Sequence, residues 1–332
     1  MKKIISILLI FTMVLSITAS IPFSALATTT DKVQSGLTYT DEYGEWTYEF
    51  TEDGNGCKIT SYDESMIEIK IPSEIDGIPV TEIGDEAFKF CRELISVIIP
   101  DSVAIIGDSA FFLCENLTSI TIPDSVTTIS YYAFGNCARL NSITIPNSVT
   151  TIGDYAFAWC SNLTNVTISD NLNTIPKFAF WNCINLTSIT IPYSVTSIEY
   201  ATFYGCIELT SIIIPNSVTR ISNDSFYNCV KLSDIYYTGS KSEWNSISIG
   251  SNAGTGDYDY FKKANIHFNY VLPKAGDISG DGEISIIDVI YLLKYINGGI
   301  ELTEEQLVNA DLNNDSEFTI VDVILIQKII IV

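Results

Sequence analysis

Seven cysteines recur in this chain at a constant interval of 23 residues, and this period constrains the fold more than any other feature. They are Cys91, Cys114, Cys137, Cys160, Cys183, Cys206 and Cys229. A phenylalanine three residues before each cysteine keeps the same interval, from Phe88 to Phe226. A repeat of this length is typical of a solenoid, in which each unit buries its apolar face only against its neighbours. The sequence therefore predicts a stack of similar rungs, with function on its surface or in attached segments.

The unit at 114–134 shows how one rung is built. Its segment Leu117-Thr-Ser-Ile120-Thr-Ile122 has the spacing L-x-x-L-x-L, and its alternation predicts a short strand. The proline that follows ends ladder pairing because it has no N–H to donate. We expect Val126 and Ile129 to cross the core, and Ala133-Phe134 to open a return segment of one helical turn.

The motif Ile-Pro-x-Ser-Val-Thr-x-Ile-x-x-x-Ala-Phe-x-x-Cys-x-x-Leu-Thr-Ser-Ile recurs through the chain and resembles the BspA-like leucine-rich repeats of bacterial surface and secreted proteins. The resemblance implies an α/β-type leucine-rich-repeat solenoid of short parallel strands and short return segments. We assign seven 23-residue repeats to 71–235. An N-terminal β-hairpin cap is expected at 36–70, where Asp53-Gly-Asn-Gly56 is a turn signal. The period breaks at 236–270, which we interpret as a C-terminal cap.

The first residues indicate export. Lys2 and Lys3 precede a long apolar run that ends near Ala25-Leu26-Ala27, so residues 1–27 are expected to be a signal peptide; an uncleaved membrane anchor is the alternative. The formal net charge of −23 argues against nucleic-acid and anionic-membrane partners. We therefore predict a secreted, extracellular protein without membrane contact after signal cleavage.

The cysteines are expected to form an inward-facing column of mostly reduced thiols, because free cysteine behaves as a small buried hydrophobe. Seven is an odd number, so no pairing scheme serves every rung. Disulfides between adjacent rungs remain an alternative, since strand spacing brings the Cα atoms close enough. Cys57 lies in the N-terminal cap, outside this column.

Beyond a linker at 271–276, oxygen-bearing side chains recur with the spacing of a calcium loop. Positions 1, 3, 5, 7, 9 and 12 of such a loop supply calcium ligands, and a helix follows. The first loop would place Asp277, Ser279, Asp281, Glu283, Ser285 and Asp288 at these positions. The second, 34 residues later, would place Asp311, Asn313, Asp315, Glu317, Thr319 and Asp322 there. Helices are predicted from Asp288 to Tyr295 and from Val323 to Ile330, and two Ca²⁺ ions are expected.

Two loop–helix units with aspartate at position 12 look like a type I dockerin, a small all-α module with two EF-hand-like loops, which we place at 277–332. The resemblance implies direct ligation by the side chains at positions 1, 3, 5 and 12, by the carbonyls of Glu283 and Glu317, and through water by Ser285 and Thr319. It also implies docking onto a scaffoldin cohesin module in a cellulosome. In the second loop, Ser316 replaces the turn glycine that Gly282 provides in the first, so weaker binding is expected there.

The resemblance assigns cohesin recognition to positions 10 and 11 of each loop. These are Ile286-Ile287 and Ile320-Val321, and their apolar character predicts a hydrophobic cohesin surface. Leu293, Lys294 and Lys328 are expected as supporting contacts. The alternative is that one isoleucine of each pair belongs to the core.

No catalytic constellation is apparent. The single histidine, His267, excludes a His-based triad or a His-rich zinc site, and the acids of the repeats lie at turn positions. Two surface columns could bind a ligand: a threonine ladder at Thr121, Thr144, Thr167 and Thr190, and an aromatic group. The aromatic residues are Tyr132, Tyr155, Phe178, Trp159 and Trp181. Packing among themselves is the alternative role for both sets.

These features together predict a secreted, non-catalytic, cellulosome-associated binding protein. Its solenoid would bind a protein or a plant cell-wall polysaccharide. The alternatives are a dockerin-bearing enzyme of polysaccharide catabolism and a cell-surface adhesin.

Overall fold

The computed structural model describes residues 36–62, 66–250, 260–270, 276–279, 283–312 and 317–331. The expected signal peptide at 1–27 and most of the expected linker at 271–276 lie outside these residues. Within the part of the chain that is described, no helix has the length and apolar character needed to cross a membrane.

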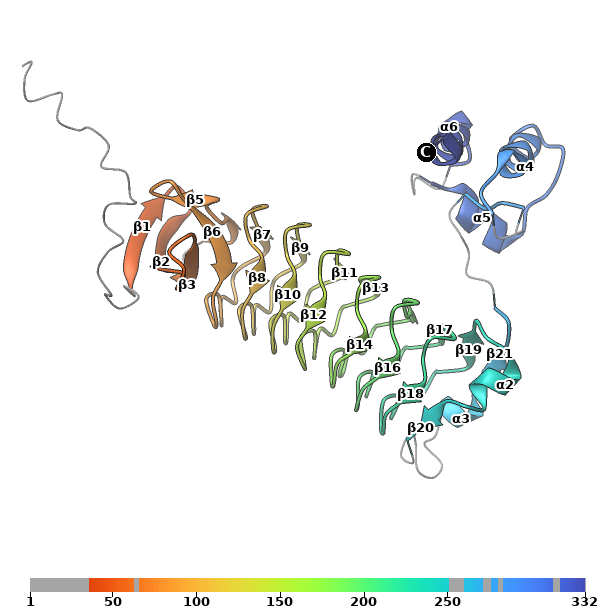
Figure 1. Ribbon diagram of the computed structural model, residues 1–332, viewed down its shortest axis with the longest axis horizontal. Coiled ribbons are helices and arrows are strands. Elements are labelled where there is room, and N and C mark those ends of the chain that lie inside the picture. The colour runs from red at the N-terminus through yellow and green to blue at the C-terminus, as the bar shows by residue number, and fades with distance from the viewer. Residues whose placement is uncertain are drawn as a thin grey trace, which may run out of the picture.

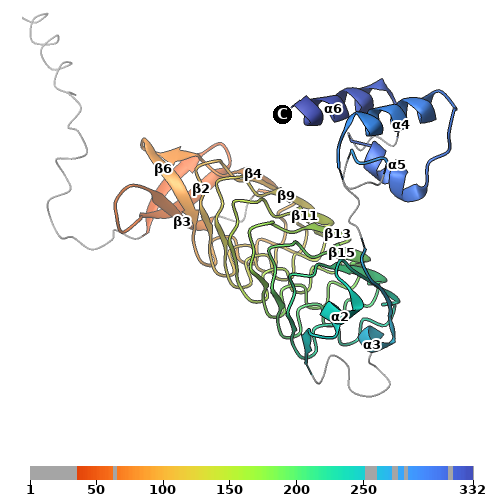
Figure 2. The same cartoon turned by 45° about the vertical axis from the view of Figure 1, so that its right-hand side comes forward.

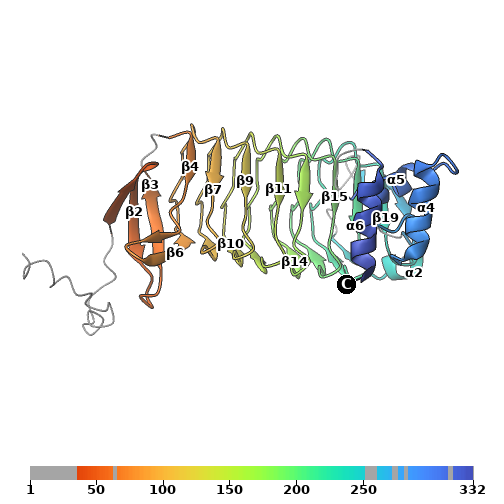
Figure 3. The ribbon, with the colours of Figure 1, turned by 90° about the horizontal axis from the view of Figure 1, so that it is seen from above.

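The repeats form a parallel β-solenoid, a stack of rungs that lies between two capping regions (Figures 1 and 3). Each rung contributes one three- or four-residue strand and one two-residue strand. Most strands pair in parallel with their equivalent in the next rung, as Ser142–Thr144 pairs with Asn165–Thr167. The ladders are interrupted between β9 and β11, between β13 and β15, and between β12 and β14. The longer strands are β4 (Glu68–Lys70), β7 (Ser96–Ile98), β9 (Ser119–Thr121), β11 (Ser142–Thr144), β13 (Asn165–Thr167), β15 (Ser188–Thr190), β17 (Ser211–Ile214) and β19 (Asp234–Tyr237). The shorter strands are β8 (Ile105–Ile106), β10 (Thr128–Ile129), β12 (Thr151–Ile152), β14 (Thr174–Ile175), β16 (Ser197–Ile198) and β18 (Arg220–Ile221).

A ladder of phenylalanine rings fills the centre of the solenoid. The rings at Phe88, Phe111, Phe134, Phe157, Phe180, Phe203 and Phe226 are buried, and neighbouring rings stack nearly parallel with centroids 4.9 to 5.6 Å apart. Trp46 meets Phe88 at one end of the ladder, and Phe261 stacks on Phe226 at 4.6 Å at the other. Because both end rings are covered by residues outside the repeats, the solenoid exposes no open core.

All eight cysteines are buried as thiols outside any disulfide, in agreement with the expected reduced column. In the column, each thiol from Cys114 to Cys229 donates a hydrogen bond of 3.1 to 3.3 Å to the carbonyl of the phenylalanine 26 residues earlier. The thiol therefore links neighbouring rungs as well as filling space.

The return segment does not contain the expected helical turn. After each short strand the backbone forms separate turns, such as Phe112 N–H to Ser109 O and Cys114 N–H to Phe111 O. Two residues of this segment are left-handed in every rung, for example Ser109 at φ 55° and Leu113 at φ 63°. A left-handed residue cannot continue a right-handed helix, so the expectation of a helix was wrong.

The N-terminal region is a three-stranded antiparallel arrangement of β1 (Leu37–Asp41), β2 (Gly44–Phe50) and β3 (Cys57–Tyr62). The turn at 53–56 joins β2 to β3. Strand β3 then pairs in parallel with β6 (Ile78–Ile83), which forms a small hairpin with β5 (Glu74–Ile75) and starts the column of shorter strands. This pairing covers the first rung (Figure 2).

At the other end, β20 (Ser248–Ile249) and β21 (Asn265–His267) extend the two columns by one strand each. The short helices α2 (Lys241–Trp244) and α3 (Tyr260–Lys263) bury Trp244 and Phe261 against the last rung. His267 lies here, 2.8 Å from Asp234 and stacked on Tyr236.

The C-terminal region is a separate helical unit with its own core. It contains α4 (Ile286–Ile296), α5 (Glu304–Ala310) and α6 (Ile320–Ile331). Val289 and Leu292 of α4 pack with Val323 and Ile326 of α6, residues that stand at equivalent positions of the two loop–helix units. Helices α4 and α6 begin two or three residues before the predicted starts, and α5 was not predicted.

Candidate functional site

The first loop gathers its polar groups around Asp288, the position-12 aspartate. Asp288 is fully buried; its Oδ1 accepts the Ser279 N–H at 2.8 Å and its Oδ2 accepts the Ser285 N–H at 2.7 Å. The Ser279 hydroxyl also donates to Asp277 Oδ1 at 3.3 Å, and Asp277 is buried. Ser279 at position 3 therefore contacts both Asp277 at position 1 and Asp288 at position 12.

The electrostatic environment keeps Asp288 ionised. Burial raises the pKa of this carboxyl, but the backbone N–H groups of Ser279 and Ser285 donate to it, and the net effect is a pKa below the usual value. Hydrogen bonds to the charged form explain this direction.

The second loop repeats the arrangement 34 residues later. Asp322 is fully buried; its Oδ1 accepts the Leu312 N–H at 3.1 Å and its Oδ2 accepts the Thr319 N–H at 3.0 Å. In both loops the position-12 aspartate accepts the position-9 N–H, whereas its second donor is at position 3 in the first loop and at position 2 in the second.

The position-9 residues act as helix caps. The Ser285 side chain accepts the Ile287 N–H, and the Thr319 side chain accepts the Val321 N–H, each at 3.1 Å. These bonds satisfy donors at the starts of α4 and α6. A hydroxyl that accepts one hydrogen bond can still make others, so the expected water-mediated contact with calcium is compatible with these caps. That contact stays a prediction.

Several predicted ligands lie outside the described residues, namely Asp281, Asn313 and Asp315, as do Gly282 and Ser316. Glu283, Asp311 and Glu317 are described. Among the residues that the structure describes, no group of three or more His, Cys, Asp or Glu side chains is close enough to hold a metal ion.

The described residues nevertheless fit a hard cation. Asp288 and Asp322 are buried carboxylates, and in the described ranges no ion pair joins either one to a basic side chain. Buried charge of one sign is costly unless an opposite charge compensates it. Calcium prefers oxygen ligands, and the positions around these aspartates supply only oxygen.

Helix α5 holds the first loop from outside, a role that the sequence analysis missed. The Gln306 side chain donates to the Ile278 carbonyl, and the Asn309 side chain donates to the Asp277 carbonyl, both at 2.8 Å. The signal was present as Thr303-x-x-Gln306, which forms a capping box at the start of α5.

The predicted recognition pairs lie on the surface. Ile286 is 59% exposed and Ile320 is 58% exposed, and their neighbours Ile287 and Val321 are also exposed. Both pairs occupy the first turns of α4 and α6. The core role considered for one member of each pair is therefore not what the structure shows.

The supporting residues are divided between surface and core. Lys294 and Lys328 are exposed, whereas Leu293 packs against the small helical core. Ile290 and Ile324, one turn after the pairs, are exposed as well and were not predicted. Each helix thus presents three exposed β-branched residues along one surface.

The aromatic residues predicted on the solenoid come together. Tyr132, Tyr155 and Phe178 form a stack with centroids 4.5 and 4.3 Å apart. Trp159 and Trp181 lie beside the stack with centroids 4.5 Å apart. Both indole N–H groups are 3.3 Å from the Asn182 amide when its oxygen faces them.

The threonine ladder also lies where it was expected. Thr121, Thr144, Thr167 and Thr190 are exposed on the strand face of four successive rungs. The stack and the ladder are therefore two distinct surfaces of the solenoid.

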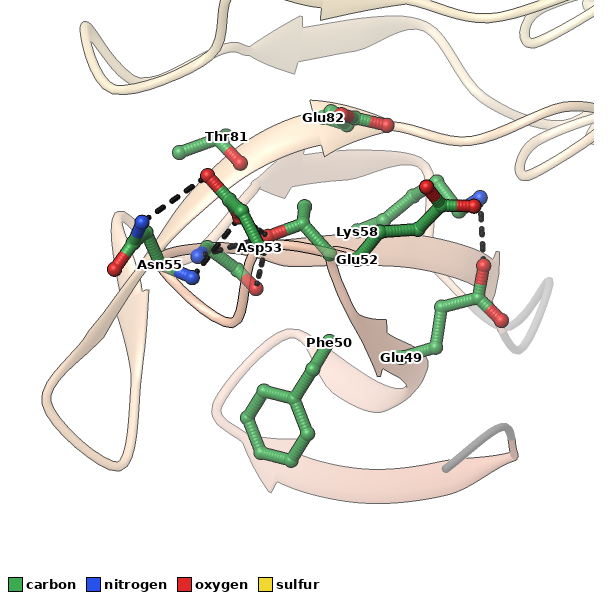
Figure 4. A pocket seen from close by; sticks show the side chains of 10 residues that line it. Glu49, Phe50, Glu52, Asp53, Asn55, Lys58, Thr81 and Glu82 are labelled. Atoms are coloured by element: carbon green, nitrogen blue, oxygen red, sulfur yellow. Dashed lines mark hydrogen bonds and ion pairs between the residues drawn. The ribbon is translucent and has the colours of Figure 1, made fainter. Parts of the chain in front are cut away.

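A cleft of about 580 Å³ lies at the N-terminal cap (Figure 4). Its polar groups bind one another: Lys58 forms an ion pair with Glu49 at 2.6 Å, and Asp53 accepts from Thr51 and Asn55. The Thr51 hydroxyl, followed by Asn55, holds the pKa of Asp53 below its usual value. The bonds of Thr51, Asp53 and Asn55 stabilise the turn between β2 and β3, so these polar residues have a structural role in the cleft.

The fold and the loops define a leucine-rich-repeat β-solenoid joined to a helical module with paired EF-hand-like loops. A family model for the BspA type leucine rich repeat region, in six copies, matches residues 81–206 and 173–253, more than half of the chain. A model for the dockerin type I domain matches residues 275–331. The chain belongs to the BspA-type leucine-rich repeat family and ends in a dockerin type I domain.

Solved structures of leucine-rich repeat proteins are similar to the solenoid. One from T. pallidum is 33% identical, covers 56% of this chain and 87% of its own, and has a TM-score of 0.53. A leucine-rich repeat protein from Bacteroides ovatus is 27% identical, with coverages of 71% and 73% and a TM-score of 0.45. No curated protein showed significant similarity to the chain.

Proposed function

We propose that this protein is a secreted, non-catalytic component of a cellulosome-type assembly. Its C-terminal module docks onto a scaffoldin cohesin in a calcium-dependent way, and its solenoid binds a plant cell-wall polysaccharide or a protein. The dockerin type I domain and the BspA-type repeats support an extracellular location and a binding role.

The observation that carries the docking proposal is the duplicated apolar surface. Ile286-Ile287 and Ile320-Val321 are exposed at equivalent positions, each pair in the first turn of a helix that also carries a buried aspartate. Exposed aliphatic side chains grouped on a surface mark interaction sites. Their chemistry matches a cohesin that offers an apolar patch of its own.

Calcium would supply the positive charge that the buried aspartates need, and so would fix the starts of α4 and α6. Because metal binding and folding are coupled, removal of calcium is expected to disorder the module and abolish docking. Two ions are proposed, one in each loop, with weaker binding in the second.

The enzyme alternative receives no support from the site geometry. The two matched modules are non-catalytic, and His267 is engaged with Asp234 and Tyr236 in the C-terminal cap. A surface adhesin, in which the repeats bind a protein, remains the second candidate, because extended solenoid faces suit protein partners.

A binding experiment with the full chain tests the docking proposal. We expect immobilised cohesin modules of differing surface chemistry to retain the chain in calcium and to release it in EGTA. The double variant Ile286→Asp/Ile320→Asp should lose binding in calcium. Ile98→Asp is a matched control, because Ile98 is an isoleucine that is 58% exposed on the solenoid. Retention that is unaffected by EGTA or by the double variant would refute the proposal.

A further inference from the structure

One surface column of the solenoid carries tyrosine at two of its positions. The residues at this position of successive rungs are Asp85, Asp108, Tyr131, Asp154, Lys177, Tyr200 and Asn223. Tyr131 is 45% exposed and Tyr200 is 40% exposed, although both stand beside the aromatic stack. The two tyrosines are three rungs apart, which at about 4.8 Å per rung is a distance of about 14 Å.

The aromatic stack fixes the orientation of both tyrosines. The ring of Tyr131 is perpendicular to Tyr132, with centroids 4.5 Å apart, and Tyr200 is nearly perpendicular to Phe178, with centroids 5.1 Å apart. Tyr131 also contacts the middle ring, Tyr155, at 5.7 Å, so its ring is held along the side of the three-ring stack, whereas Tyr200 is held at the Phe178 end. A ring that is held in place loses less conformational freedom when a ligand covers it.

The stack itself is built on unfavourable backbone positions. Tyr132, Tyr155 and Phe178 have φ values of 51°, 62° and 56°. Bulky residues rarely adopt this left-handed conformation, and other rungs place Ser109 and Ala201 at the same position. The same position is left-handed in every rung, so the solenoid backbone itself fixes where these three rings lie.

Hydrogen-bonding groups lie between and beyond the two tyrosines. Asp154 is half-buried, and its Oδ1 accepts the Lys177 N–H at 3.1 Å. Beyond Tyr200 lies a cleft of about 410 Å³. Its lining includes Lys177, Tyr200 and Asn223 of the column, together with Glu199 and Arg220, which form an ion pair.

From this arrangement we infer that a neutral, linear polysaccharide lies along the solenoid axis, across Tyr131 and Tyr200, and enters the cleft beside Asn223. Aromatic rings offer flat apolar surface for the C–H faces of sugar rings, and the intervening carboxylate, amide and hydroxyl groups can bind sugar hydroxyls. The column runs from rung to rung, so an extended polymer fits it better than a compact ligand. This inference rests on the proposed polysaccharide binding by the solenoid and assigns it to one surface.

The net charge of the protein distinguishes among the possible ligands of this surface. A net charge of −23 repels polyanionic polymers and a second copy of the same chain. The net charge does not repel neutral glycans. A neutral ligand can also cover the tyrosine rings without burying an unpaired charge, because the rings are uncharged.

Affinity electrophoresis of the full chain in gels that contain a polysaccharide tests the inference. The probes are hydroxyethyl cellulose, a neutral xylan and, as an acidic polymer, polygalacturonate. We expect at least one neutral polymer to retard the wild type, and Tyr131→Ala/Tyr200→Ala to weaken retardation at least about tenfold. Tyr131→Phe/Tyr200→Phe should keep most of the binding, because the rings remain.

Tyr193→Ala is the matched control, since Tyr193 is 53% exposed and lies outside the aromatic cluster. It should bind as the wild type does, and equal melting temperatures would show that the variants fold. If neutral polymers retard the wild type and the double alanine variant equally, the assigned surface is wrong while polysaccharide binding stands. If no neutral polymer retards the wild type, or only polygalacturonate does, the inference is overturned. If no polymer of any kind binds, polysaccharide binding is also removed from the proposed function. Cohesin docking is measured separately and is not affected by either result.

Discussion

The thiol of Cys160 donates a 3.2 Å hydrogen bond to the carbonyl oxygen of Phe134 in the preceding rung. The same bond recurs along the column from Cys114 to Cys229. A cysteine side chain is small enough for the tight interior and still supplies a weak donor to a buried carbonyl. The repeated cysteine is therefore part of the rung-to-rung bonding, and it does not form a chemical site.

The buried thiols should be unreactive in the native protein. Burial raises the pKa of Cys160 to about 12, so its thiol stays protonated well above the pH of about 8.5 at which a free cysteine ionises. At pH 8, a colorimetric thiol reagent should label almost none of the eight cysteines in the folded chain and all of them in denaturant. Rapid labelling of several cysteines in the native state would contradict the buried, reduced column.

Removal of a central ring should destabilise the whole stack. Phe134 is fully buried and stacks on both Phe111 and Phe157, so Phe134→Ala should lower the free energy of unfolding by about 3–5 kcal/mol. Phe90→Ala is the control, because Phe90 is exposed, and it should cost far less. Urea unfolding followed by circular dichroism measures both; similar losses for the two variants would rule out a dominant central ladder.

The left-handed turn positions make a separate prediction. Asn136 has φ 58°, and a β-branched residue is strongly disfavoured there. Asn136→Val should destabilise the protein by about 1–3 kcal/mol, whereas Asn136→Gly should be nearly neutral. Thermal unfolding of the two variants decides the matter, and equal stability of both would mean that the turn has another conformation.

Calcium binding should depend on each position-12 aspartate separately. Asp288→Asn and Asp322→Asn keep side-chain size but remove the buried charge, so each should abolish binding in its own loop. Isothermal titration calorimetry of the full chain should give two sites for the wild type and one for each single variant. A variant that keeps two sites would exclude its aspartate as a ligand.

The rungs were predictable because a constant period leaves few solutions. Apolar residues that recur every 23 residues, such as Ile120 and Ile143, must meet in the same layer of a stack. The turns between them were not predictable, because Ser109, Leu113 and Tyr132 share a left-handed backbone but no common side-chain chemistry. Position in the rung, enforced by packing on both sides, imposes that conformation.

The helical module shows the same division. The spacing of Asp277, Asp288, Asp311 and Asp322 predicted two loop–helix units, and both position-12 aspartates are buried and accept the position-9 N–H of their loop. Helix α5 was missed because its seven residues lack a long apolar period and depend on the cap at Thr303. Only the fold showed that Gln306 and Asn309 hold the first loop.

The sequence by itself determined the solenoid, its register and the duplicated loops, because the period of the apolar residues and the spacing of the oxygen-bearing residues are properties of the sequence alone. Tertiary structure decided which periodic residues reach the surface. Ile286 and Ile320 have the composition of core residues but are exposed, since Val289, Leu292, Val323 and Ile326 already fill the space between α4 and α6. Tyr131 and Tyr200 are exposed for a related reason: the stack of Tyr132, Tyr155 and Phe178 fills the space beside them and holds their rings against it.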